Sequence, residues 1–546
     1  MKIRIKNAKI VNSRRESIRE GEILIDGSHI TKVASHIEDK VDKVIDAKDR
    51  YVVPGFIDAH VHIESSLLTP NEFSRVVSKH GTTTVVADCH EICNVVGVKG
   101  LQLFIKETEE MPLEVFFVIP SCVPASHLGT SGAKITVRDI KKALLHERVV
   151  GLGEVMNFPK VIGRHKDMIS KIRACKGMVI SGHAPSLQGK RMKEYFDAGI
   201  MDDHESPTYE EMAEKADYGI VIFLREGSAE KSTDEQYRII ESHPNMTCFC
   251  SDDKSVLDIE RHGSILYNVN RALSLGYEPL RVIKCATHNC ARHYRIDSIV
   301  GNIEARQDAD FFFCKSLKNI EPEVVFINGE IVFSKSKGVK ARPKFKYPNY
   351  VRKSIRHKPI SVDDLKIPKA HRGNVIVAED GSLHTGWKKV KMKSDYDHRQ
   401  DILKIAIIER YRKNGRISVG QIKGFGLKRG ALGTSIAHDC HNLIVIGSDD
   451  ESIVKVANEL IRIGGGFSVC SGRSVNSLSL PVAGLMSQEK YDVVAKKLRD
   501  LRNFAKKTGC RMRHPFATLS FMALEVIPEL KITDKGLVDV EKFRII

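Results

Sequence analysis

The chain has 546 residues, 42% hydrophobic and 28% charged, a composition that predicts a globular protein of two or three domains. Its net charge of +17 would suit a nucleic-acid surface, but aromatic stacking positions are sparse and no nucleic-acid-binding motif occurs, so we expect no nucleic-acid partner. An eighteen-residue apolar run, an apolar leader and a disulfide-type cysteine spacing are all absent, so we expect a cytoplasmic protein with reduced thiols and no membrane partner.

The first fifty residues alternate apolar and polar side chains between Gly-containing turns, which predicts several short antiparallel strands. A similar pattern returns at VVFINGEIVFS, residues 324–334. We expect residues 1–52 and 300–336 to form one small β-sandwich domain, into which the segment between them is inserted.

The stretch from residue 52 to residue 66 places His60 and His62 two positions apart, just beyond an apolar run. On a strand both imidazoles would face the same side. The C-terminal mouth of a parallel barrel strand is where such barrels keep their chemistry. A histidine pair without a metal is equally common, so the pair alone leaves both interpretations open.

Further ligand-type residues end other short apolar runs: Glu154, His183, His204 and Asp252. With the apolar runs at 82–88, 114–119 and 218–224, the number of candidate strands reaches eight. Eight strands with room for helices between residues 53 and 299 predict an α/β fold, a (β/α)8 TIM-like barrel.

A basic segment, residues 337–372, contains prolines and few large apolar side chains, and it predicts a linker across the surface. After it, residues 373–546 predict a separate α/β domain. Its expected elements are an amphipathic helix at 401–413, a buried strand at 442–447 and a long charged helix at 488–508.

Two features of this C-terminal segment resemble functional motifs. The glycines at 464–466 lack the Lys-Ser or Lys-Thr of a phosphate loop, so we predict a turn. His438 and His441 have no third ligand nearby, and we favour a structural or metal-supporting role over direct ligation.

Several motifs occur in a fixed order: PGFIDAHVHIESS, DCHEICNVVG, GLGEVMNFP, SGHAPSLQGK, MDDHES, LREGS, CSDDK, GALGTSIAHDCHN and LPVAGLMS. Together they resemble the adenine deaminase family of the amidohydrolase superfamily over almost the whole chain. The resemblance implies hydrolytic deamination of adenine to hypoxanthine and ammonia, by metal-activated hydroxide, in purine salvage or catabolism.

The resemblance also implies a binuclear metal site, with manganese as the working assignment and iron or zinc as the other options. It assigns His60, His62 and Asp252 to one ion, His183 and His204 to the other, and Glu154 to both. Asp252 would also accept a proton from the attacking water and pass it to the departing ammonia. We choose Asp252 over Asp253 because neighbours on a strand point in opposite directions.

Further catalytic candidates lie beside the metal ligands. Glu64 and Glu91 are candidates to protonate or hydrogen-bond the purine, and His90 to assist proton transfer; loop capping is an equally good interpretation of each one. The predicted substrate-binding residues are Glu64, Asp88, Arg225, Glu226 and Ser228.

A cytidine-deaminase-like enzyme would need a P-C-x-x-C after the H-x-E of His62 and Glu64, and none follows. An amidohydrolase acting on a cyclic amide or on another 6-aminopurine is the enzyme alternative, and a non-catalytic binding protein on the same fold is the alternative from another class. We expect adenine as the substrate and a homo-oligomer, a dimer.

Overall fold

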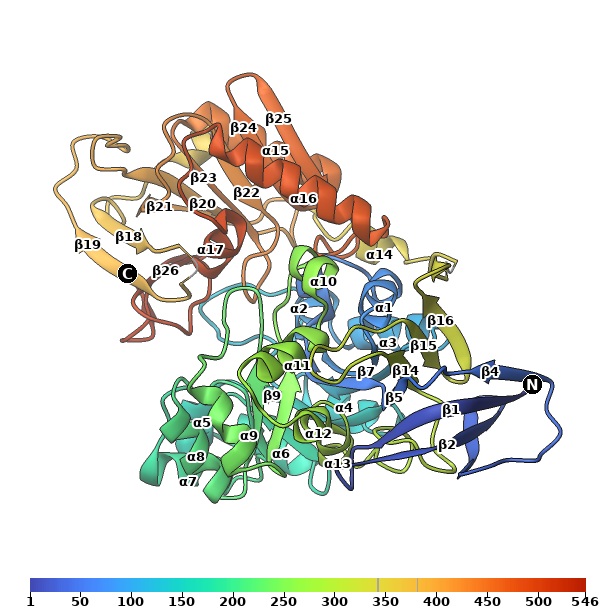
Figure 1. Cartoon of the computed structure of the whole chain (residues 1–546). Coiled ribbons are helices and arrows are strands. Elements are labelled where there is room, and N and C mark those ends of the chain that lie inside the picture. The colour runs from blue at the N-terminus through green and yellow to red at the C-terminus, as the bar shows by residue number, and fades with distance from the viewer. Residues whose placement is uncertain (341–342, 381) are drawn as a thin grey trace.

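The computed structural model describes residues 1–340, 343–380 and 382–546 (Figure 1). One sheet of nine strands joins the segments before and after the barrel. Its strands are β1 (Lys2–Asn12), β2 (Ser17–Asp26), β3 (His29–Ala34), β4 (Lys43–Asp46), β5 (Tyr51–Pro54), β14 (Phe311–Cys314), β15 (Val324–Ile327), β16 (Glu330–Ser334) and β17 (Gly338–Val339). Strand β5 pairs with β1 on one side and with β14 on the other, so the barrel is inserted between two parts of this sheet.

Eight parallel strands form the barrel: β6 (Phe56–Val61), β7 (Thr82–Asp88), β8 (Glu114–Ile119), β9 (Val149–Val155), β10 (Val179–Gly182), β11 (Asp202–Asp203), β12 (Val221–Arg225) and β13 (Thr247–Cys250). Strands β6 to β10 and β11 to β13 pair in chain order as two arcs. The arcs meet where Met201 N donates to Ile180 O and where Asp252 N donates to His60 O, both at 2.9 Å. The predicted (β/α)8 barrel is confirmed, and every predicted strand overlaps an observed one.

The helices between the barrel strands are α1 (Pro70–Ser78), α2 (His90–Val96), α3 (Val98–Thr108), α4 (Val137–Ala143), α5 (Phe158–Ile162), α6 (Lys166–Ala174), α7 (Gly189–Phe196), α8 (Tyr209–Asp217) and α9 (Ile239–Ser242). The last strand, β13, is followed by α10 (Val256–His262), α11 (Ile265–Ser274), α12 (Pro279–Cys285) and α13 (His288–His293). Short 3-10 turns are η1 (Ile63–Ser66) and η2 (Gln236–Arg238). Helix α11 shows why they pack: Ile265, Val269 and Ala272 recur at helical spacing and are buried against the strands. No helix in the described part of the chain has the length and apolar run needed to cross a membrane.

The C-terminal domain contains a sheet of eight strands: β18 (Asn374–Ala378), β19 (Thr385–Lys389), β20 (Leu403–Ile408), β21 (Ile417–Lys423), β22 (Ala431–Thr434), β23 (Leu443–Gly447), β24 (Gly466–Ser471) and β25 (Ser474–Ser479). The other elements of the domain are α15 (Asp450–Ile463), α16 (Tyr491–Lys506), α17 (Pro515–Phe521), β26 (Leu530–Thr533), β27 (Gly536–Asp539) and β28 (Arg544–Ile545). Strand β23 and helix α16 confirm the predicted buried strand and long charged helix. Gly464 ends α15 with φ 77°, which confirms the predicted turn.

The helix predicted at 401–413 is wrong. Residues 403–408 form β20, which pairs with β21 and β23 in the middle of the sheet. All six of its residues are buried. A short apolar run flanked by charges fits a helical period and a buried strand equally well, and here sheet pairing decides between them.

The basic segment contains α14 (Asn349–Arg352) and η3 (Val362–Leu365). Its apolar side chains Tyr347 and Val351 are buried, and the Tyr347 hydroxyl donates to Glu107 of α3. Lys344 and Lys353 are exposed. The segment therefore runs along the barrel surface with its charges in solvent. Two positions of its expected range, 341 and 342, lie outside the described residues.

The C-terminal domain covers one end of the barrel; it is the yellow-to-red part at the top of Figure 1. The domain forms hydrogen bonds with the loop that follows β8. Ser126 Oγ donates to Glu525 Oε1 and Thr130 N donates to Asp534 Oδ1, each at 2.8 Å. Because this loop leaves the C-terminal end of a barrel strand, the covered end is the one at which barrel enzymes place their active sites.

Candidate active site

Two histidines lie at the C-terminal end of β6. The Nε2 atoms of His60 and His62 are 3.2 Å apart, and both side chains are buried. His62 Nδ1–H donates to the backbone carbonyl of Asp88 at 2.8 Å. Because a carbonyl oxygen only accepts, this bond leaves the lone pair of His62 Nε2 free to bind a metal.

Glu154, at the end of β9, joins two groups of histidines. Its Oε1 lies 3.4 Å from His62 Nε2, whereas its Oε2 lies 2.7 Å from His183 Nδ1 and 3.4 Å from His204 Nε2. Its backbone N–H donates to the Asp88 carboxylate at 3.0 Å, which fixes the strand end. Burial alone would raise the pKa of Glu154, but the histidines hold it well below its usual range. The two carboxylate oxygens therefore face different sets of nitrogen atoms.

Asp252 faces the first histidine pair from the opposite side. Its Oδ1 lies 3.1 Å from His62 Nε2 and 3.6 Å from His60 Nε2. Its Oδ2 accepts from Arg225 Nη1 at 2.8 Å. Burial would raise the pKa of Asp252, but hydrogen bonds from the two histidines, together with the guanidinium, hold it well below its usual range.

The reason that Asp252 and Asp253 point apart differs from the predicted one. Strand β13 ends at Cys250, and Asp252 has the left-handed value φ 52°. Asp253 accepts a hydrogen bond from Ser65 and lies at a pocket instead. A turn, rather than strand alternation, separates the two carboxylates.

The donor atoms fit a metal cofactor. His204 is only 4% exposed, yet neither of its ring nitrogens has a hydrogen-bond partner among the described residues. A buried imidazole whose nitrogens make no hydrogen bond is costly, and metal ligation would satisfy it. The donor atoms lie within 4.8 Å of one another in overlapping groups of three: His60, His62 and Glu154; His60, His204 and Asp252; and Glu154, His183 and His204. Nitrogen and carboxylate donors in such groups are typical of transition-metal sites.

Glu205 is a residue of this site that the sequence analysis missed. It forms an ion pair with Arg225, and its Oε1 lies 3.7 Å from His204 Nε2 and 3.9 Å from His183 Nδ1. Arg225 therefore connects Glu205 to the ligand-type carboxylate of Asp252. The one sequence feature that could have indicated Glu205 is its position directly after the predicted ligand His204.

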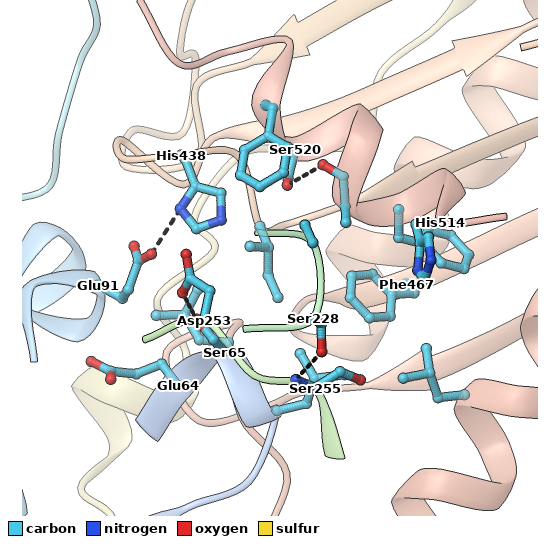
Figure 2. A pocket seen from close by; sticks show the side chains of 18 of the residues that line it. Glu64, Ser65, Glu91, Ser228, Asp253, Ser255, His438, Phe467, His514 and Ser520 are labelled. Carbon is cyan, nitrogen blue, oxygen red and sulfur yellow. Dashed lines mark hydrogen bonds and ion pairs between the residues drawn. The ribbon is translucent and has the colours of Figure 1, made fainter. Parts of the chain in front are cut away.

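A pocket of about 110 Å³ lies between the barrel mouth and the C-terminal domain (Figure 2). The barrel contributes Glu64, Ser65, Glu91, Ser228 and Asp253, among others. The C-terminal domain contributes a largely apolar wall that includes Ile436, His438, Phe467, Leu485, Leu498, Phe516, Ala517 and Phe521. Three of the predicted substrate or catalytic residues, Glu64, Glu91 and Ser228, thus line this pocket.

Glu64 lines the pocket and has one buried carboxylate oxygen without a hydrogen-bond partner among the described residues. Its Oε1 accepts from the backbone N–H of Ile92 at 3.0 Å, whereas its Oε2 has no partner in the described part of the chain. Burial raises the pKa of Glu64 to about 7. His90 lies next to the ligand cluster, with Nδ1 3.4 Å from Glu154 Oε1.

The structure does not bring the other predicted substrate contacts to the pocket lining. The Asp88 carboxylate supports the backbone of β9, and Arg225 pairs with acidic residues of the ligand cluster. Glu226 accepts from the Tyr237 hydroxyl at 2.8 Å and is buried beside it. In each case a nearby donor or acceptor within the barrel holds the side chain away from the pocket.

Glu91, in the first turn of α2, is held by the C-terminal domain. His438 Nδ1 lies 2.7 Å from Glu91 Oε1, and His441 Nε2 contacts Glu91 Oε2. Burial would raise the pKa of Glu91, but the two histidines and His90 hold it well below its usual range. Both histidines therefore contact a carboxylate outside the proposed set of metal ligands.

Two protein-family models match the chain: the amidohydrolase family at residues 51–263 and 248–332, and the adenine deaminase C-terminal domain at residues 381–544. An adenine deaminase of Dehalococcoides mccartyi is 39% identical over 99% of this chain and 95% of its own length. An adenine deaminase of Archaeoglobus fulgidus is 38% identical over 99% of this chain and 94% of its own length. A solved β-aspartyl dipeptidase from Fervidobacterium islandicum aligns with a TM-score of 0.48 and 22% identity, over 63% of this chain and 100% of that one.

Proposed function

The chain belongs to the adenine deaminase family of amidohydrolases and is a metal-dependent hydrolase acting on adenine, and we propose that its ligand cluster holds two metal ions. Deamination replaces the exocyclic amine at C6 of adenine with oxygen from water. The reaction therefore needs hydroxide near neutral pH and a ring nitrogen that can be protonated. Bound metal supplies the first requirement by lowering the pKa of water from about 15.7 towards about 7.

The observation that carries this proposal is the orientation of Glu154. Because its two oxygens face different histidine groups, this carboxylate could contribute one oxygen to each of two ions. His60, His62 and Asp252 would complete the first site, and His183 and His204 the second. Nitrogen and carboxylate donors without thiolate suit manganese, iron and zinc, and the family resemblance leads us to propose manganese.

The remaining roles follow from position. Asp252, buried beside the ligand histidines, accepts the proton of the attacking water and passes it to the departing ammonia. Arg225 holds the outer oxygen of that carboxylate and so fixes its orientation. Glu64, which lines the pocket with one oxygen unpaired in the described part of the chain, would hydrogen-bond the purine. Glu91 and His90 would assist proton transfer; Glu91 lines the pocket, and His90 Nδ1 lies 3.4 Å from Glu154 Oε1.

Metal analysis combined with a substrate panel tests the proposal. Purified active protein should carry up to two transition-metal equivalents per chain, lose ammonia release from adenine on chelation and regain it with manganese. Cytosine and dihydroorotate should not be turned over. Active protein without any transition metal would contradict the metal site, and preference for dihydroorotate would contradict the substrate assignment.

Adenine should be preferred over adenosine. The pocket is closed on one side by the C-terminal wall that includes Phe467, Phe516 and Phe521, and ribose would add bulk at N9 of the purine. We expect kcat/KM for adenosine to be lower by roughly 10²-fold, the loss that follows when a reacting group is misplaced. Comparable kcat/KM values for the two compounds would count against this description of the pocket.

A further inference from the structure

The loop between β22 and β23 brings a histidine of the C-terminal domain into the pocket. His438 lines the pocket and lies 2.7 Å from Glu91 through its Nδ1 atom. Its ring stacks on Phe521 with centroids 5.3 Å apart and an interplanar angle of 23°. Figure 2 shows the imidazole beside Glu91 and above Asp253, at the end of the pocket where Glu64 also lies. Two contacts thus fix the ring, and Nε2 is the nitrogen left for another partner.

The two histidines that hold Glu91 differ in charge. Burial lowers the pKa of His438, but the Glu91 carboxylate outweighs it and raises this pKa to about 9. Burial lowers the pKa of His441, which is enclosed completely. His438 is therefore the cationic member of the pair near neutral pH, with N–H donors on both ring nitrogens.

We propose that His438 is a substrate-contacting residue of the adenine site, with Nε2–H donating to a ring nitrogen of the purine while Glu91 holds Nδ1. This inference rests on the proposed function of the pocket. Adenine presents acceptor nitrogens in its ring and N–H donors at its amine and imidazole edge. A donor at His438 and the carboxyl group of Glu64, which lines the same end of the pocket and has one oxygen without a partner in the described residues, complement such a molecule. The C-terminal domain then supplies part of the active site itself.

A purely structural role makes a different prediction. If the His438–Glu91 contact only held the two domains together, removing another interdomain contact of similar strength would change purine binding to the same extent. Thr130 Oγ1 donates to Asp534 Oδ2 at 2.6 Å, and neither residue lines the pocket. Thr130→Val is therefore a matched control, because it weakens the same interface without changing the groups around the purine.

The test compares His438→Phe with the wild type, using 1-, 3- and 7-deazaadenine as competitive inhibitors of adenine deamination. Phenylalanine keeps the stacking on Phe521 and removes both N–H donors. In the wild type, the analogue that lacks the partner nitrogen should bind about 10- to 100-fold more weakly than its isomers, the effect of one charge-assisted hydrogen bond. In His438→Phe this discrimination should vanish, and KM for adenine should rise by a similar factor. Metal content should stay at the wild-type value.

His438→Gln retains one amide donor and should recover part of the lost binding, which provides a second readout if His438→Phe folds poorly. Thr130→Val should keep the discrimination of the wild type. Equal discrimination in wild type and His438→Phe, no discrimination among the three analogues in the wild type, or a loss of discrimination in Thr130→Val would each overturn the inference. Failure of the proposed function is distinguishable, because metal-loaded wild type would then release no ammonia from adenine.

Discussion

Asp252→Asn should lower kcat by roughly 10²- to 10⁴-fold, the usual effect of losing a general base. In the structure Oδ1 of Asp252 faces His60 and His62, and Oδ2 faces Arg225. The amide keeps one oxygen that can face the histidines, but it cannot accept a proton. Steady-state kinetics and elemental analysis should therefore show low turnover with most of the metal retained.

Asp253→Asn is the matched control for this prediction. Its carboxylate accepts from Ser65 and lines the pocket, but a turn directs it away from Arg225. We expect a rate loss of less than about tenfold, because the amide oxygen introduced at position 253 can still accept a hydrogen bond from Ser65. Equal rate losses in the two variants, with metal content unchanged, would overturn the assignment of Asp252.

The barrel and its ligand cluster could be predicted because both depend on local patterns. Most barrel strands are short apolar runs that end near a ligand-type residue, as residues 149–153 do before Glu154, whereas β11 before His204 is only Asp202–Asp203. Parallel strands then bring these ends together at one rim. Hydrophobic periodicity cannot predict the secondary structure where a helix and a buried strand fit the same pattern. Residues 403–408 fit a helix, yet they form β20 because they pair with β21 and β23 on either side.

The pocket was harder to predict because its walls come from distant parts of the chain. The contact between Glu91 and His441 spans 350 residues, and no local pattern in either motif indicates the other. The placement of Arg225 is similar, since its orientation depends on Glu205 and Asp252 together. Residue types near the metal could be recognised from motifs, but which of them face the substrate depends on how the domains pack.

Glu154→Gln should remove at least one of the two proposed metal ions and lower kcat by at least the factor expected for Asp252→Asn. The two oxygens of Glu154 face separate histidine groups, so replacing one of them with an amide nitrogen leaves one group facing a donor that cannot bind a cation. Elemental analysis should show about one equivalent per chain or less.

Glu205→Gln is the control, because Glu205 lies 3.7 Å from His204 Nε2 yet is held in an ion pair with Arg225. It should keep most of the metal, since an amide oxygen can still accept from the guanidinium. If Glu154→Gln retained two equivalents and near-normal turnover, or if Glu205→Gln lost as much metal, Glu154 would not be the shared ligand. The pair of variants thus separates a carboxylate that binds two ions from one that only balances a neighbouring charge.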